Sequence, residues 1–263
     1  MKELLTEFQT ILESKSLAEK KIWWEKYLHN VIQFRGIAIP VVRECLVEWY
    51  KKKQLNLLSE EKLFELATEF LKCEPAEDKM TGILLVELFL LKPENYKKIV
   101  DLTEILLDNK FIWDWNTNDW LCVRWLTPIV SDMTSEFVDR IIAWCNADYL
   151  WKARCSVVPF AQAKHKFEMI EKIETAIEVV IQRKEKFAKT GVGWVLREIS
   201  KFDVGYVSNF IEKNIVHFTA ESLKNAMKYS EQTKRKNYLN LMYKAQEKLQ
   251  KQEATNVEIK EKK

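Results

Sequence analysis

Glycine and proline are scarce in this chain of 263 residues. It contains 5 of each, whereas average usage would give roughly 18 glycines and roughly 13 prolines. Turns between strands favour both residues. No segment shows a sustained alternation of polar and apolar residues, the pattern typical of a half-buried strand. The sequence therefore predicts an all-α protein.

Motifs for metal binding and redox chemistry are missing. No two cysteines have the CxxC spacing, and the three histidines stand far apart. Zinc-binding and thiol-exchange motifs are therefore unsupported. The five cysteines lie in apolar, helical surroundings, and we expect them to be buried, reduced thiols. They are Cys45, Cys73, Cys122, Cys145 and Cys155.

Long apolar runs are also absent. The best candidate extends from Gly82 to Leu91 and includes Glu87, about half of the roughly 20 residues that a membrane-spanning helix needs. The segment Met1–Phe8 lacks the apolar core of a signal peptide. We therefore expect a cytoplasmic protein without a membrane partner.

Charge of one sign does not dominate either. The 42 lysines and arginines face 39 acidic residues, for a formal net charge of +3. This balance does not by itself indicate nucleic-acid binding. Any DNA-binding face must be a local patch.

What the sequence does contain is a succession of amphipathic segments joined by short polar breaks. Pairs of such helices, each about 35 to 45 residues long, are typical of a HEAT-like helical repeat solenoid, in which antiparallel helix pairs stack. We expect one such domain over residues 1–245. Residues 246–263 are rich in Lys, Glu and Gln, and we expect a charged, disordered tail there. The expected helices cover residues 4–27, 41–50, 60–71, 83–91, 96–107, 119–130, 135–146, 150–163, 167–187, 193–202, 204–213 and 219–229.

Three pairs of residues combine a tryptophan with a charged side chain three or four positions later. On a helix, each pair would lie on one face. An indole beside a charge suits a cationic base that is joined to a phosphate backbone. The pairs are Trp115 with Asp119, Trp151 with Arg154, and Trp194 with Arg197.

Over most of its length the sequence resembles the HEAT-like-repeat DNA glycosylases of the AlkD type, which excise alkylated purines. Two amino-terminal segments, 26–30 and 34–37, are similar to the family's tyrosine helix and the turn after it. Trp115 with Asp119 resembles the family's Trp-Asp-x-x-Asp element. The segment Trp151–Arg154 looks like its Trp-x-x-Arg helix. The most specific match is Gly193–Glu198, which is close to the family's Gly-Trp-x-Leu-Arg-Glu helix.

The resemblance implies a concave solenoid face that holds double-stranded DNA. It also implies hydrolysis of the bond between an N3- or N7-alkylated purine and deoxyribose, by a monomer without metal or cofactor. In this scheme the catalytic set is Asp119, the carboxylate, Trp115, an aromatic wall, and Arg154, a phosphate contact. The remaining DNA-binding set is Trp194, Tyr27, Arg197, Trp151, Lys164 and Lys166.

Physical chemistry supports these roles. An alkylated purine is cationic and leaves readily, so the enzyme has chiefly to stabilise an oxocarbenium-like sugar and position water. One preorganised carboxylate is suited to that task. Indole faces attract cations by roughly 0.5 to 2 kcal/mol, which favours the charged lesion over a neutral base.

A second alignment remains open because Asn116 and Asn118 depart from the family's element. Matching Pro128 to the family's later proline would put Trp120 in the tryptophan position and Arg124 in the catalytic one. We prefer Asp119, because the segment from there to Arg154 then aligns without a gap. The Arg124 alignment would describe a non-catalytic relative that binds damaged, bent or branched DNA.

Simpler interpretations accompany these assignments. Asp119 could be the N-cap of a helix that begins at Trp120, and Arg197 could pair with Glu198 or Asp203 on a solvated face. A third functional class is a helical-repeat scaffold, since such solenoids often bind peptides on a concave face.

Overall fold

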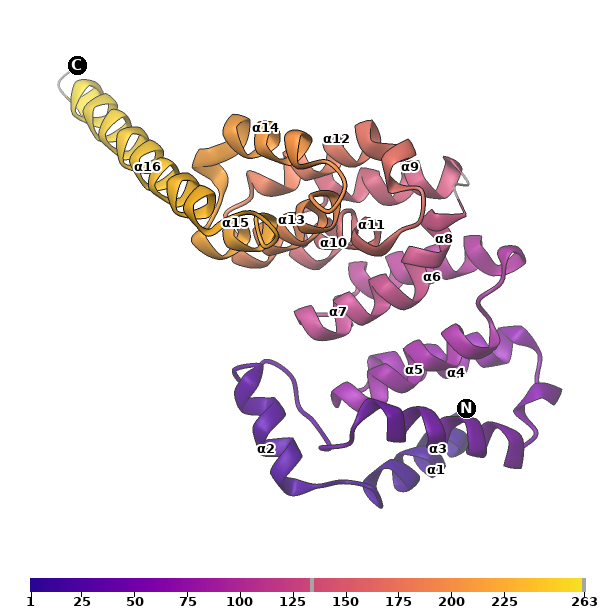
Figure 1. Cartoon of the computed structure of the whole chain (residues 1–263). Coiled ribbons are helices and arrows are strands. Elements are labelled where there is room, and N and C mark those ends of the chain that lie inside the picture. Colours follow the sequence, from indigo (N-terminus) through magenta and orange to yellow (C-terminus); the bar gives the residue numbers. More distant parts are fainter. Residues whose placement is uncertain (133–134, 262–263) are drawn as a thin grey trace. The chain divides into compact units, whose positions relative to one another are not determined.

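The computed structural model describes residues 1–132 and 135–261, and all of the regular elements in these ranges are helical (Figure 1). The predicted all-α fold is therefore confirmed. The chain divides into two compact units, a first unit over Met1–Phe137 and a second unit over Val138–Lys263. The expectation of one repeat domain over residues 1–245 stays a prediction.

In the first unit, α5 is the central helix. It packs against α3, α4, α7 and the π-helical turn η3, and residues 76–86 within it are all buried. The helices of this unit are α1 (Lys2–Glu13), α2 (Ala18–Tyr27), α3 (Ile39–Lys52), η1 (Leu55–Leu57), α4 (Glu60–Lys72), α5 (Ala76–Phe89), η2 (Pro93–Asn95), α6 (Tyr96–Asp108), α7 (Trp115–Leu121), η3 (Cys122–Leu126) and α8 (Thr127–Ser131).

The start of α7 differs from the predicted one. The side chain of Asp114 accepts a hydrogen bond from the Thr117 N–H at 3.0 Å, so Asp114 is the N-cap and the helix begins at Trp115. The interpretation of Asp119 as an N-cap is wrong, because Asp119 lies inside α7.

The π-helical turn η3, which is wider than an α-helical turn, follows α7 and has a local cause. Pro128 offers no N–H to the carbonyl of Arg124 and its ring crowds that carbonyl, which a π-helical turn accommodates.

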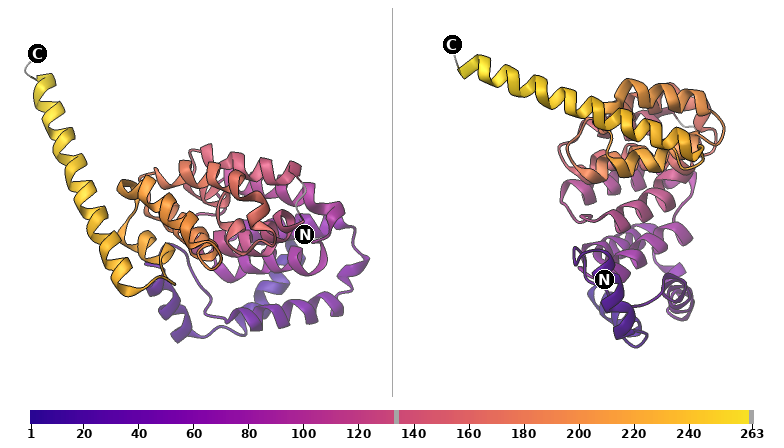
Figure 2. Two further views of the ribbon diagram at one scale, coloured as in Figure 1. Left: turned by 45° about the horizontal axis from the view of Figure 1, so that its top comes forward. Right: turned by 60° about the vertical axis from the view of Figure 1, so that its left-hand side comes forward.

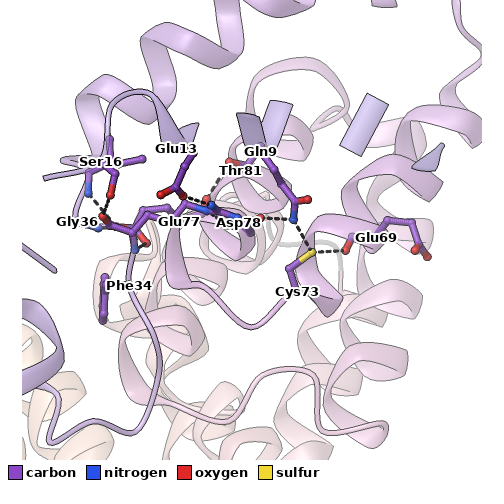
Figure 3. A network of polar contacts seen from close by, with 12 residues as sticks. Gln9, Glu13, Ser16, Phe34, Gly36, Glu69, Cys73, Glu77, Asp78 and Thr81 are labelled. Atoms are coloured by element: carbon purple, nitrogen blue, oxygen red, sulfur yellow. Dashed lines mark hydrogen bonds and ion pairs between the residues drawn. The ribbon is translucent and has the colours of Figure 1, made fainter. Parts of the chain in front are cut away.

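Helix α2 has no fully buried residue. It is held both by Trp24, which packs against the apolar cluster that includes Phe34, and by polar contacts. Figure 3 shows the network that fixes the segment after it. The buried carboxylate of Glu77 accepts the backbone N–H groups of Arg35, Gly36 and Ile37 at 2.8, 2.8 and 2.9 Å. The Arg35 guanidinium binds the buried Asp78, with 2.6 Å between Nε and Oδ2. Glu77 and Asp78, expected between two helices, thus lie in the first turn of α5.

Gly36 brings this segment into direct contact with the start of α2. Its φ is +89°, and a Cβ atom there would lie 2.2 Å from the carbonyl oxygen of Leu17 and 2.7 Å from the nitrogen of Lys21. Only a residue without a side chain fits this approach. The Phe34–Ile37 segment is therefore a clamp on the amino-terminal end of α2.

A buried lysine fixes the loop before α7. Lys79 of α5 is fully buried, and its Nζ donates hydrogen bonds to the carbonyl oxygens of Leu71 and Phe111, both at 2.7 Å. The same ammonium lies 3.9 Å from the ring centroid of Trp113. Burial lowers the pKa of Lys79 to about 8, although the nearby Asp114 opposes this change.

In the second unit, α13 is the central helix and packs against α10, α11, α12, α14 and α15. A Cβ atom on Gly193 would lie 2.6 Å from the carbonyl oxygen of Ser222, so this glycine permits close contact between α13 and α15. The elements are α9 (Ser135–Ala143), η4 (Trp144–Asn146), α10 (Leu150–Cys155), α11 (Val158–Gln162), η5 (Lys166–Met169), α12 (Ile170–Ile181), α13 (Lys186–Ile199), α14 (Val204–Asn214), η6 (Ile215–His217), α15 (Ala220–Ala226) and α16 (Gln232–Glu261).

The end of the chain also differs from the expected tail. Helix α16 continues without a break through residues 246–261 and extends away from the other helices of its unit (Figure 2). This stretch contains neither glycine nor proline. Glu247 and Lys251, one turn apart, form an ion pair of 2.7 Å, the kind of pair that supports an exposed helix.

We expect Gly36→Ala to lower the free energy of unfolding by roughly 3 kcal/mol or more, because alanine at positive φ is strained and its Cβ would overlap backbone atoms. Urea denaturation followed by circular dichroism measures this. The control is Gly205→Ala in α14, where the new Cβ would meet only a carboxylate oxygen at 3.3 Å. That control is expected to change stability by less than about 1 kcal/mol. Equal midpoints for the two variants would contradict the clamp.

Lys79→Met should alter how stability depends on pH. The pKa of about 8 lies below the ordinary value of 10.5, so between these pH values the unfolded chain binds more protons and the native protein gains stability as pH rises. The cost of the buried charge is fully present below pH 8. The free energy of unfolding of the native chain minus that of Lys79→Met should therefore rise by roughly 3 kcal/mol between pH 8 and 10.5. A difference that stays constant over this range would refute a buried ammonium.

Candidate functional site

In the first unit, the structure places Tyr27, Trp115 and Asp119 on one side of α7. Trp115 is partly buried and packs against the apolar cluster that includes Leu28 and Phe34. The ring of Tyr27 meets the ring of Trp115 edge-on, with centroids 6.0 Å apart. Asp119 follows Trp115 by about one helical turn and is therefore on the same face.

Asp119 is partly exposed. The concave DNA-binding face expected around it stays a prediction. Asn118, one of the two residues that differ from the family's Trp-Asp-x-x-Asp element, is fully buried within the unit. Asn116, the other departure, is partly exposed in the first turn of α7.

Trp120 and Arg124, the residues of the second alignment, form a separate pair on another face. Five positions separate Asp119 from Arg124, which corresponds to roughly 100° or more around the helix axis. The Arg124 guanidinium carbon lies 4.7 Å from the Trp120 ring centroid, and its Nη1 lies 2.9 Å from Oε1 of Glu87. The other oxygen of Glu87 binds Arg43 at 2.7 Å. Arg124 thus shares one carboxylate with Arg43, and the three side chains together keep one positive charge.

In the second unit, Arg154 is directed at α13. The residue is only 4% exposed, and its Nη1 donates to the carbonyl oxygen of Phe187 and to Oγ1 of Thr190, the latter at 3.2 Å. Gly191 leaves the space for it, since a Cβ atom there would lie 3.1 Å from Nη1. Trp194 follows Gly191 by three positions and lies on the same face of α13. Arg154, which belongs to α10, therefore packs against the face of α13 that carries Trp194.

Trp151 and Arg197, two other predicted residues of this unit, also have partners within the fold. Trp151 is buried, and its ring centroid lies 5.5 Å from that of Phe187. Arg197 lies 5.8 Å from the Trp194 ring and binds Glu198 through both Nε and Nη2, at 2.8 and 2.7 Å. The simpler interpretation of Arg197 as the partner of Glu198 is therefore confirmed.

The two predicted lysines differ in exposure. Lys164 is exposed, whereas Lys166 is partly buried at the start of η5. Burial lowers the pKa of Lys166 and the charge of Lys201 lowers it further, against the opposing charge of Glu198. Lys166 therefore lies in the same charged neighbourhood as the Arg197–Glu198 pair.

Sequence reasoning missed three features of the first unit. It did not include Trp23 among the candidate binding residues, whereas the structure leaves this side chain 57% exposed. It treated Glu77 and Asp78 as a break between helices, although carboxylates just after Pro75 are also typical of a helix start. Lys79 gave no signal at all, because its partners are backbone carbonyls far along the chain.

Most of the cysteine side chains lie inside the protein. Four of the five cysteines are buried, as predicted, and Cys73 is partly buried. Burial raises the pKa of Cys73 to about 11. Within the described residues, no group of three or more His, Cys, Asp and Glu side chains could hold a metal ion. No helix of this part of the chain is both long and apolar enough to cross a membrane.

Comparison with known proteins identifies the family. The model of a family described as DNA alkylation repair enzyme matches residues 8–230. A solved structure, described as a predicted DNA alkylation repair enzyme from Enterococcus faecalis, is similar with a TM-score of 0.68 and 18% sequence identity. The match covers 83% of this chain and 98% of that one, and at this identity it supports the fold alone. No curated protein matches the sequence. Because the family model spans most of the chain, this protein belongs to the DNA alkylation repair enzyme family.

Proposed function

We propose that the chain is a DNA glycosylase that hydrolyses the N-glycosidic bond of N3- or N7-alkylated purines in double-stranded DNA. The observation that carries the proposal is the arrangement on α7, where the partly exposed Asp119 shares a face with Trp115 and Trp115 contacts Tyr27. Membership of the DNA alkylation repair enzyme family supports DNA as the partner.

The chemistry needs only groups that this face offers. The bond between C1′ and the purine nitrogen breaks, and the purine leaves with the electron pair, which cancels its positive charge. The sugar becomes oxocarbenium-like, and the Asp119 carboxylate stabilises that charge. Water then adds to C1′ and loses a proton. The aromatic faces of Trp115 and Tyr27 favour a cationic base over a neutral one.

In the second unit, taken by itself, Arg154 and Trp194 are the residues that the family resemblance assigns to DNA contacts. With 4% exposure, Arg154 offers a phosphate only a small surface, and its hydrogen bonds to Phe187 and Thr190 support a positioning role for α13. Trp194 on the same helix remains partly exposed and is the aromatic wall of this unit. Trp151 is buried and supports α10 from within.

The second candidate is a non-catalytic member of the family that binds damaged, bent or branched DNA. The observation in its favour is Arg124, which is partly exposed beside Trp120. A guanidinium stacked on an indole suits a phosphate or a base. Such a protein would bind DNA without releasing a base.

Base release distinguishes the two candidates. Asp119→Asn should lower the rate of 7-methylguanine release from methylated duplex DNA on the order of 10²- to 10³-fold, because an amide cannot stabilise the developing positive charge. Arg124→Gln is the matched control and should keep at least half of the native rate. Both variants should retain the native circular dichroism spectrum. If the native chain releases no base above the spontaneous rate, the glycosylase proposal is wrong and the binding candidate takes its place.

The salt dependence of binding tests the lysines of the second unit. If Lys164 contacts a phosphate, Lys164→Gln should reduce the slope of log K against log[salt] by about 1, because one fewer counterion is released. Fluorescence anisotropy with an unmodified duplex measures this. Lys97→Gln is the control, since that side chain pairs with Asp101 at 2.8 Å on the surface of the first unit. Parallel slopes for all three proteins would exclude Lys164 from the interface.

A further inference from the structure

Helix α2 exposes large apolar side chains instead of burying them. Ile22 is 65% exposed, Trp23 57% and Tyr27 52%. None of the residues of α2 is buried. Soluble proteins rarely leave such side chains together on the surface, and where they do, the patch usually marks a binding site.

Two of these rings are held ready for a flat ligand. Trp23 and Tyr27 are stacked, with centroids 5.3 Å apart and planes 4° from parallel. The edge of Trp24 meets Tyr27 at 5.9 Å, and Trp24 in turn stacks on Phe34 of the clamp segment. The pair is therefore supported on its inner side while more than half of each side chain faces solvent.

Two lysines of α2, Lys20 and Lys26, lie three positions before and after Trp23, on the same side of the helix as the stacked pair, whereas Lys21 lies on the side that meets Gly36. Lys20, Lys21 and Lys26 are all exposed, and within residues 1–132 and 135–261 none of them forms an ion pair with a carboxylate. Glu25, one of the two acids of α2, accepts the backbone N–H of Phe34 at 3.1 Å and is thereby directed at the clamp segment. Flat rings among unneutralised cations suit a nucleic acid, which offers bases and phosphates at matching intervals.

The pattern on α2 does not favour a lipid surface. A helix that lies on a membrane separates its apolar and charged residues into two faces, whereas those of α2 are mixed around the helix. The helix is also anchored, since Gly36 contacts its start and extended segments flank it (Figure 1). Tyr27 connects it to the candidate site, because its ring also contacts Trp115 on α7.

We propose that Trp23, stacked on Tyr27, is a platform for an unpaired nucleobase of the bound DNA, with Lys20 and Lys26 contacting the neighbouring phosphates. This inference rests on DNA being the partner. Inside a duplex both faces of a base are covered by its neighbours, so an indole can stack only on a base that has left the stack. Trp23 therefore selects locally unpaired DNA and contributes to recognition rather than to the chemical step.

Binding of two unmodified duplexes tests the platform, because neither contains an alkylated base that the protein could remove during the measurement. One duplex is fully paired and the other carries a single unpaired nucleotide. Trp23→Ala should raise the Kd for the second duplex roughly tenfold, which is the range of one stacked base, and should change the Kd for the paired duplex less than about twofold. Trp23→Phe should recover part of the loss. Anisotropy titrations at one fixed salt concentration give these values.

Ile22→Ala is the matched control, since Ile22 is the adjacent and more exposed residue but has no ring to stack. It should leave both Kd values unchanged. Replacing Lys20 and Lys26 by glutamine should weaken the binding of both duplexes and reduce the salt slope by about 2. Circular dichroism should show native helix content in every variant.

The possible failures are distinguishable. If the native chain binds neither duplex, the proposed function fails and this inference falls with it. If the native chain binds both duplexes and Trp23→Ala weakens them equally or not at all, only the platform is overturned. An effect of Ile22→Ala as large as that of Trp23→Ala would overturn it as well, and would assign α2 to an apolar partner.

Discussion

The carboxylate of Glu77 is the contact on which the position of α2 depends. An isolated buried carboxylate is costly, but here three backbone N–H groups satisfy it, from Arg35, Gly36 and Ile37. These bonds fix a segment that has no regular structure, and through Gly36 that segment meets the start of α2. Helix α2 also packs through Trp24 on Phe34, which belongs to the segment that these bonds fix. The polar anchor therefore supports the contact between Tyr27 and Trp115 together with this packing.

Helix α5 supplies the same kind of contact repeatedly. Lys79 holds the loop before α7 through two carbonyl oxygens, and Glu87 near its other end binds Arg43 and Arg124. A buried or half-buried charge is tolerated only where its partners are in place. Any other arrangement of α2, α7 or their neighbours would leave one of these charges without its partner and would be less stable. The central helix of the first unit thus positions both α2 and α7, the helices that carry Tyr27, Trp115 and Asp119.

The sequence predicted what local signals determine. The scarcity of glycine and proline indicated the all-α fold, and the helix expected over residues 60–71 is α4, which Ser59 caps. Errors occurred where partners are distant in sequence. The acidic start of α5 was interpreted as a break between helices, because Arg35, which binds Glu77 and Asp78, lies about 40 residues earlier in the chain. The exposure of Trp23 was missed for a related reason, since an indole in a mixed helix is usually buried and only the tertiary position of α2 leaves it outside.

The distribution of neutralised charge decides where a polyanion can bind. With a net charge of +3, the chain as a whole attracts DNA only weakly, so local cations must supply the attraction. Several arginines that the sequence suggested for this role already have partners: Glu198 binds Arg197, and Glu87 binds Arg124. An arginine that is already paired gains little from a phosphate, because the first ion pair must be broken or shared. Two exposed lysines of α2 face no such competition, and they flank the only stacked pair of exposed rings within residues 1–132. In the first unit, electrostatics and aromatic exposure therefore point to the same helix, next to the face that carries Asp119.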